Sequence, residues 1–164
     1  MARIVVIGGT GYAGGHIVRE AASRGHEVVA VSRKAPESPV DGVTYVQGSV
    51  LDAAFLGDVV KGADAVVSSV SPRGDMLDDG LRALQTVAGV VEGSGIRLGV
   101  VGGAMGSLSE PGGPRLFDLG VPEEYRHEAT VGVESLDFLQ GTGEGLDWFF
   151  VHPPLVFGSW QPGE

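Results

Sequence analysis

Short apolar stretches alternate with amphipathic stretches along most of the chain. The apolar stretches are rich in β-branched residues and too short for helices, so strands are predicted at residues 3–7, 27–32, 43–47, 65–70, 98–101 and 146–151. Apolar residues spaced three and four apart predict helices over residues 14–24, 52–61, 77–91 and 122–139. We therefore expect a doubly wound α/β Rossmann fold with a parallel sheet, three α/β/α layers and strand order 3-2-1-4-5-6.

One stretch, from residue 102 to residue 120, breaks this alternation. It is rich in Gly and Pro and follows the fifth predicted strand. Loops of that length are uncommon in compact domains and are usually functional or disordered. Otherwise the 164 residues have the size of one domain, so residues 1–164 are expected to form a single nucleotide-binding unit.

Composition and charge narrow the function classes. The net charge is −10 and the 11 Lys and Arg form no basic stripe, which argues against nucleic-acid binding. No apolar run approaches the roughly 18 residues that span a bilayer, and no signal-peptide pattern is seen, so no membrane association is expected. The absence of cysteine fits a cytoplasmic location. His16, His26 and His127 share no ligand spacing, so no metal is expected.

A glycine-rich loop, Gly8-Gly9-Thr10-Gly11-Tyr12-Ala13-Gly14, joins the first strand to the first helix. Gly8 lets the chain turn off the strand, Gly11 leaves room for a pyrophosphate, and Gly14 lets the helix pack closely. The phosphates would meet free N–H groups and the positive end of the helix dipole. This context favours a dinucleotide site over a plain Gly-rich turn, with contacts at Gly8, Thr10, Gly11, Tyr12, Ala13 and Gly14.

The spacing Gly-x-x-Gly-x-x-Gly resembles the short-chain dehydrogenase/reductase superfamily, and within it the atypical NAD(P)H-binding members related to NmrA-like proteins and flavin/biliverdin reductases. The resemblance covers nearly the whole chain and rests on IGGTGYAGG at 7–15, GADAVVSSV at 62–70, VVGGAMGSL at 100–108 and LDWFFVHPPLVFG at 146–158. It implies further cofactor contacts at Ser49, Val50, Ser69, Val70, Gly102, Gly103 and Pro153. Similar proteins have Gly-Asp-Val where this chain has Gly48-Ser49-Val50, so Ser49 would hold the adenine more weakly.

The end of the second predicted strand faces the adenosine ribose. An Asp or Glu there, about 20 residues after the glycines, would bind the 2′-hydroxyl of NAD. This chain has Ser32-Arg33-Lys34 instead, and a guanidinium pairs well with a 2′-phosphate. NADP(H) is therefore expected rather than NAD(H). Two solvated basic residues at a strand end are the alternative interpretation.

Three residues are candidates for chemistry: Tyr125, His152 and Ser107. In the superfamily that the chain resembles, a Tyr is activated by a Lys four residues later. Here Ala129 takes that place, so Tyr125 is expected to pack or to contact substrate. His152 ends the sixth strand, where a proton donor would meet the ligand crevice, but a lone His there is more often structural. Ser107 could donate a hydrogen bond to the substrate.

These features predict an NADP(H)-dependent oxidoreductase that lacks the Tyr–Lys pair. It would transfer hydride to a small acceptor such as a quinone, a flavin or a carbonyl compound, which requires proximity more than a strong acid. The resemblance also permits a non-catalytic NADP(H)-binding redox sensor. A nucleotide-sugar epimerase or dehydratase ranks lower, because those enzymes resemble the Tyr–Lys pattern.

The resemblance also implies that a further strand and helix follow the sixth strand and complete the substrate pocket. We therefore expect this chain to lack that segment and to end in a loop at residues 161–164. Four apolar residues would then be partly uncovered, namely Leu155, Val156, Phe157 and Trp160. Because such clusters usually mark an interface, a second copy of the chain could cover them in a homodimer.

Overall fold

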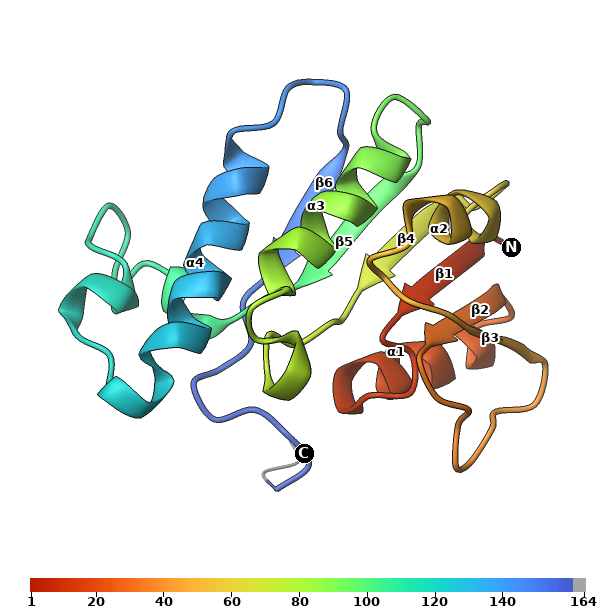
Figure 1. Cartoon of the computed structure of the whole chain (residues 1–164), viewed down its shortest axis with the longest axis horizontal. Helices are drawn as coiled ribbons and strands as arrows, with labels where there is room; N and C mark the ends of the chain where they lie inside the picture. Colours follow the sequence, from red (N-terminus) through yellow and green to blue (C-terminus); the bar gives the residue numbers. More distant parts are fainter. Residues whose placement is uncertain (161–164) are drawn as a thin grey trace.

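Six parallel strands form a single sheet in the computed structural model, which describes residues 1–160 (Figure 1). The predicted loop at residues 161–164 lies outside the described residues. The strands are β1 (Arg3–Ile7), β2 (Glu27–Ser32), β3 (Val43–Gln47), β4 (Ala65–Ser68), β5 (Arg97–Val101) and β6 (Trp148–Val151). Their order is β3-β2-β1-β4-β5-β6, which confirms the predicted doubly wound topology.

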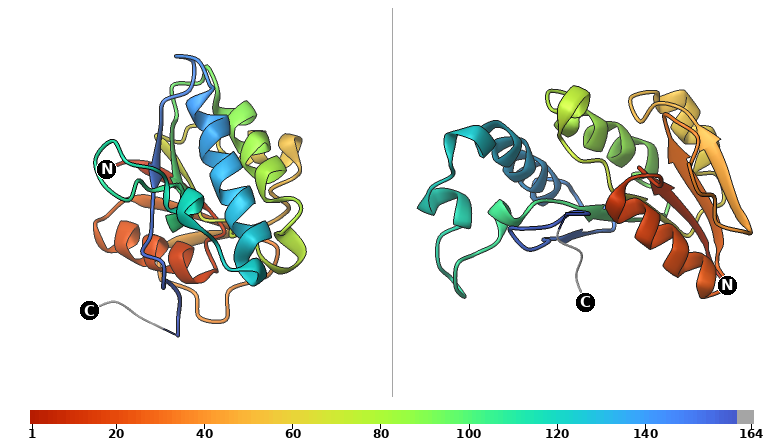
Figure 2. Two further views of the ribbon diagram at one scale, coloured as in Figure 1. Left: turned by 90° about the vertical axis from the view of Figure 1, so that its left-hand side faces the viewer. Right: turned by 90° about the horizontal axis from the view of Figure 1, so that it is seen from below.

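Helices cover both faces of the sheet, but unequally. Helices α2 (Ala53–Val59), α3 (Gly80–Val91) and α4 (Arg126–Gln140) lie along one face, while α1 (Tyr12–Ser23) packs on the other (Figure 2). The alternation of side chains along β1 divides the core accordingly. Val5 and Ile7 join the larger cluster toward α2 and α3, and Val6 joins the smaller cluster beneath α1. In the described part of the chain, no helix has the length and apolar character needed to cross a membrane.

Local sequence explains where α1 and α2 begin or end. Gly25 has a φ of 78°, a left-handed conformation that favours glycine, and it lets the chain leave α1. At α2, the carboxylate of Asp52 accepts a 3.0 Å hydrogen bond from the backbone N–H of Phe55. This is the N-cap interaction that Asp commonly provides.

Two predicted strands are shorter than expected. The fourth was expected to reach residue 70 but ends at Ser68, because its neighbour β1 ends at Ile7. The sixth was expected from residue 146 but begins at Trp148. Leu146 is nevertheless buried, so its apolar character reflects core packing before the strand begins.

Two predicted helices begin later than expected. Residue 77 was predicted to lie in a helix, but a 3₁₀ turn at Gly74–Met76 comes first and α3 starts at Gly80. Pro122 was predicted to start the last helix, but it precedes a 3₁₀ turn at Glu123–Tyr125, and α4 starts at Arg126. Both turns shape the chain at the same edge of the sheet, the edge where the strands end.

The Gly- and Pro-rich stretch after β5 is folded into short elements. It contains 3₁₀ turns at Ala104–Gly106 and Leu116–Leu119, and an antiparallel bridge joins Leu108 to Arg115. Arg115 also donates to the carboxylate of Asp137 on α4 at 2.6 Å. The stretch is therefore tied to α4 at Arg115, although residues 108–112 and 118–120 are exposed to solvent.

Candidate functional site

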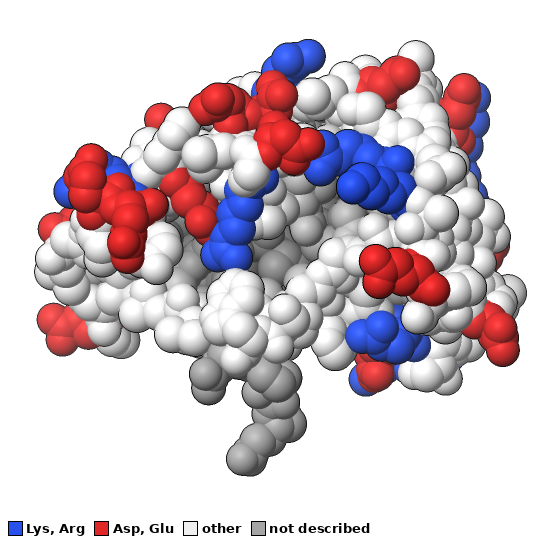
Figure 3. Space-filling view, turned by 60° about the horizontal axis from the view of Figure 1, so that its bottom comes forward, with Lys and Arg blue, Asp and Glu red and all other residues white. Residues whose placement is uncertain are grey.

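A large cleft opens at the carboxyl ends of the strands, as expected for a doubly wound sheet. Its volume is about 1050 Å³, and the hollow with Lys and Arg side chains near its rim is visible in Figure 3. The predicted cofactor residues that line it are Gly8, Thr10, Gly11, Tyr12, Ala13, Ser32, Arg33, Lys34, Val50, Ser69, Val70, Gly102, Gly103 and Pro153. Gly14 and Ser49 are absent from the lining. The structure thus brings together residues that lie far apart in the sequence.

The glycine loop has the geometry that its sequence predicts. Gly8 has a φ of +80°, and a Cβ there would lie 3.0 Å from the carbonyl oxygen of Ser69. A Cβ on Gly14 would overlap the carbonyl oxygen of Gly8, so Gly14 permits close helix packing instead of lining the cleft. At Gly11, a Cβ would meet only the Gly8 carbonyl oxygen, at 3.3 Å. Gly11 therefore leaves space on the cleft side.

The first turn of α1 offers backbone donors to this space. Gly11 is the N-cap of α1, and within the described residues no side chain caps the helix. Tyr12 and Ala13 follow in the first turn and line the cleft, and that turn contains no acidic residue. Uncapped N–H groups at the positive end of a helix dipole attract anions. The loop therefore fits the pyrophosphate of a dinucleotide.

Ser69 couples the glycine loop to β4. Its hydroxyl donates to the carbonyl oxygen of Ile7 at 2.8 Å and approaches that of Gly8 at 3.3 Å. Its backbone N–H also donates to the carbonyl oxygen of Ile7, at 2.9 Å. Ser69 lines the cleft as predicted, but its hydroxyl serves the loop backbone.

The end of the cleft beside β2 contains an ion pair that the sequence does not reveal. Arg33, after β2, donates to both carboxylate oxygens of Asp75, with Nη2 lying 3.2 Å from Oδ1. This hydrogen bond to Arg33 lowers the pKa of Asp75 below its usual value and raises the pKa of Arg33. Ser49 makes a hydrogen bond within its own segment, because its hydroxyl accepts from the backbone N–H of Leu51 at 3.2 Å.

The other end of the cleft combines segments that follow β4, β5 and β6. Gly102 and Gly103 come from β5 and Pro153 from β6, and Tyr125, which is 55% exposed, lies before α4. Arg73, which sequence analysis missed, also lines this cleft. Its Nε donates to Glu128 at 2.7 Å, and its guanidinium lies 5.7 Å from the centre of the Trp160 ring. The position of Arg73 just after a strand was the only signal for it.

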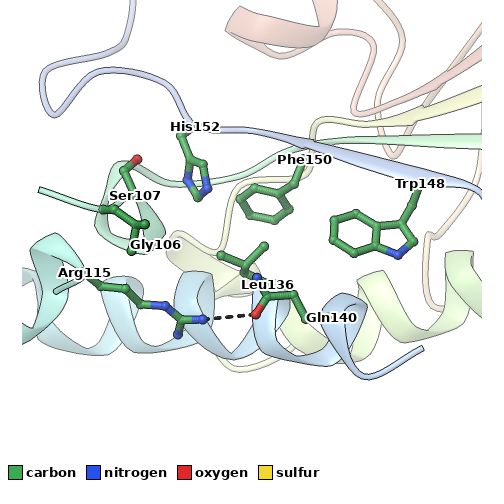
Figure 4. Close-up of a pocket in the computed structure, with 9 residues that line it drawn as sticks. Gly106, Ser107, Arg115, Leu136, Gln140, Trp148, Phe150 and His152 are labelled. Carbon is green, nitrogen blue, oxygen red and sulfur yellow. Dashed lines mark hydrogen bonds between the residues drawn. The ribbon is translucent and has the colours of Figure 1, made fainter. Parts of the chain in front are cut away.

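A second, smaller pocket of about 490 Å³ lies between β6 and α4 (Figure 4). It contains two of the predicted catalytic residues, His152 and Ser107. The Nδ1 atom of His152 lies 2.7 Å from the carbonyl oxygen of Gly103. Because a carbonyl oxygen only accepts, Nδ1 carries a hydrogen and donates the hydrogen bond. The imidazole packs against Phe150, which together with Gly106 lines both pockets. The structure thus groups His152 with Ser107 but places Tyr125 in the larger cleft.

Comparisons with known proteins agree with this geometry. A family model described as NAD(P)H-binding matches residues 8–157. The protein YwnB of Bacillus subtilis is 34% identical, and the match covers 99% of this chain and 79% of YwnB. An isoflavone reductase homolog from Zea mays is 42% identical over 77 residues, which cover 40% of this chain and only 25% of the maize protein.

Solved structures extend the likeness to the whole fold. A candidate NADH-flavin reductase from Streptococcus pneumoniae has a TM-score of 0.81 and 31% identity, covering 94% of this chain and 73% of its own. A candidate epimerase from Bacteroides thetaiotaomicron has the same score and identity, covering 94% and 72%. The Bordetella bronchiseptica enzyme WbmG, solved with NAD, shares the fold at a TM-score of 0.68 and 21% identity, covering 90% and 52%.

Proposed function

This chain belongs to the NAD(P)H-binding family, and we propose that it is an NADP(H)-dependent oxidoreductase that passes hydride to a small acceptor such as a flavin, a quinone or a carbonyl compound. The observation that carries this proposal is the glycine loop, where the uncapped turn of α1 faces a cleft of about 1050 Å³. That volume is at the upper end of the range for ligand and cofactor pockets. The likeness to a candidate NADH-flavin reductase supports the acceptor class.

The preference for NADP(H) rests on charge at the adenosine end. Arg33 and Lys34 line the cleft directly after β2, where an NAD-binding domain usually has an acidic residue. A planar guanidinium can donate two parallel hydrogen bonds to a phosphate, and the lysine adds a second positive charge. A 2′-phosphate would therefore be favoured there over a hydroxyl.

At the other end, the contribution of the chain is to position an acceptor. Bound nicotinamide would supply hydride from its C4 atom. Gly102, Gly103 and Pro153 present little side-chain bulk to the cleft, so a planar acceptor can approach closely. The Tyr125 hydroxyl is available to donate a hydrogen bond, but Ala129 supplies no cation to activate it. Proximity is therefore the main contribution to rate.

A second candidate function is a non-catalytic NADP(H) sensor. It is favoured by the separation of His152 from the larger cleft and by the absence of a Lys at position 129. A nucleotide-sugar epimerase or dehydratase is disfavoured by that same missing lysine. We also propose a cytoplasmic location, which the lack of cysteine supports.

Binding and turnover measured separately test these proposals. Titration with NADPH and NADH is expected to show at least about tenfold tighter binding of NADPH, or roughly 1.4 kcal/mol. Flavin, quinone and carbonyl acceptors are then added to the NADPH complex, and its oxidation is followed by absorbance. Oxidation with one acceptor class supports the enzyme, and binding without any oxidation supports the sensor. No binding of either nucleotide would overturn both.

A further inference from the structure

The ion pair between Arg33, which lines the cleft, and Asp75 joins two segments at the edge of the sheet where the strands end. Arg33 follows β2, whereas Asp75 lies in the 3₁₀ turn at Gly74–Met76, after β4. Strands β2 and β4 flank β1 on either side, and the glycine loop continues from β1. The pair, which we term the Arg33–Asp75 bridge, therefore spans the adenosine end of the cleft.

We propose that Asp75 is a specificity-determining residue, which competes with the 2′-phosphate of NADP(H) for Arg33 and so limits discrimination against NAD(H). This inference rests on the proposed function, because it requires a pyridine nucleotide in the cleft. It also extends that function, since it assigns the choice between the two cofactors to a residue from the opposite side of the cleft.

The competition follows from the hydrogen-bonding groups of Arg33. Its Nη1 and Nη2 atoms both donate to the Asp75 carboxylate in the bridge. A phosphate that approaches end-on and accepts from both Nη atoms needs the same edge of the guanidinium. The Asp75 carboxylate and the 2′-phosphate cannot both bind this part of the guanidinium, and two negative charges placed so close together would repel each other. NAD(H) has a neutral hydroxyl at the 2′ position, so its binding does not require the bridge to open.

Exposure makes the bridge displaceable. The Arg33 side chain is 54% exposed and that of Asp75 is 73% exposed, and ion pairs in such surroundings are weak. The following residue, Met76, is 7% exposed and anchors the turn in the core. The backbone at Asp75 is thus held in place while its carboxylate can rotate away. A doubly charged 2′-phosphate can therefore replace the carboxylate on Arg33. Breaking the Arg33–Asp75 bridge costs free energy, and this cost reduces the affinity for NADP(H) but not for NAD(H).

Asp75→Asn tests the inference directly, because the amide keeps the size of the side chain and removes its charge. We expect the Kd for NADPH to fall about three- to tenfold, while that for NADH changes less than about twofold. The half-cofactors 2′,5′-ADP and 5′-AMP should repeat this difference without any turnover. Asp78→Asn is the matched control, since Asp78 is also an aspartate nearby in the chain but contacts His127.

A second variant separates competition from a general change in charge. In an Arg33→Gln background, Asp75→Asn should lose most of its effect on NADPH affinity, because no guanidinium remains to compete for and only weak charge repulsion is removed. An equal effect on NADPH and NADH, or an effect of undiminished size without Arg33, would overturn the role of Asp75. Failure of the wild-type protein to bind either nucleotide would instead overturn the proposed function, and the first titration reveals this before any variant is made.

Discussion

The two ends of the cleft are built in different ways. The glycine-loop end is built on seven consecutive residues, Gly8 to Gly14, and presents backbone N–H groups to the cleft. The other end, which we propose receives the acceptor, draws on the segments that follow β4, β5 and β6, and it presents side chains such as Tyr125 and Arg73. One end therefore depends on local backbone geometry, and the other depends on how distant segments pack together.

This difference has a consequence for how each end can change. A loop that needs a positive φ at Gly8 and close packing at Gly14 tolerates few substitutions, whatever acceptor the protein uses. At the acceptor end, exposed side chains such as Tyr125 and Arg73 can be exchanged more readily, because about half of each is in solvent. In the proposed oxidoreductase, the acceptor could therefore change while the glycine loop stays the same, because one fold can carry different functional sites.

The largest effect is expected from Gly11→Val. Gly11 has an extended backbone with φ −76° and ψ 176°, which valine adopts readily, so the fold should remain intact. The branched side chain would fill the space for the pyrophosphate, and affinity for NADPH and NADH should fall more than about a hundredfold, roughly 2.8 kcal/mol or more. Nucleotide titration measures the loss.

Gly89→Ala is the matched control for that substitution. Gly89 lies in α3, and a Cβ there would meet no described atom within 4 Å. Binding should be unchanged and stability should rise by about 0.5–1 kcal/mol, because alanine favours the helix. Retained nucleotide affinity in Gly11→Val would contradict the assignment of the loop.

An intermediate effect is expected from Arg33→Asp, which should change the affinity for NADPH but not that for NADH. NADPH affinity should fall about ten- to a hundredfold, because a charge-assisted bond is lost and a carboxylate faces the 2′-phosphate. NADH affinity should change little. Arg24→Asp removes an arginine paired with Glu20 at the far end of α1 and serves as the control. Equal losses for both nucleotides would show that Arg33 does not recognise the phosphate.

The smallest effect is expected from Tyr125→Phe at the acceptor end. Without a lysine at position 129, the hydroxyl is expected to orient substrate rather than transfer a proton, so the rate of hydride transfer should stay within a few fold of wild type. Tyr45→Phe is the control, since the Tyr45 hydroxyl accepts from the N–H of Val40 in the backbone between β2 and β3. A decrease of about a hundredfold, typical of a lost acid–base group, would give Tyr125 a catalytic role.

The sequence predicts the glycine-loop end and most of the sheet. The strands at Arg3–Ile7, Glu27–Ser32 and Val43–Gln47 match their predicted bounds. Each is an uninterrupted run of residues that favour strands, and each ends at polar or glycine residues. The loop was recognisable because its geometry depends on residues that are adjacent in the chain. For these strands and this loop, the local sequence pattern is enough to predict the structure.

The rest of the cleft could not be predicted in this way. The 3₁₀ turn at Gly74–Met76 has no periodic pattern, and Asp75 meets Arg33 only because β4 lies two positions from β2 in the sheet. His152 was predicted to end the sixth strand but follows β6, which ends at Val151; its Nδ1 is held by Gly103, and the ring lies in the smaller pocket. A side chain at the end of a strand can enter either pocket. The packing of the folded chain decides between them, and the spacing of residues along the sequence does not reveal it.

The hydrogen bonds of Ser69 have a consequence for the order in which the protein assembles. Its hydroxyl reaches the carbonyl oxygen of Gly8 across 61 residues of chain. Closing a segment that long costs entropy before any contact repays it, so such contacts form late in folding. Helix content should therefore recover early in refolding, while nucleotide affinity should return only when β4 joins β1. Binding of NADPH would then report completion of the central sheet rather than formation of the strand–loop–helix unit that carries the glycines.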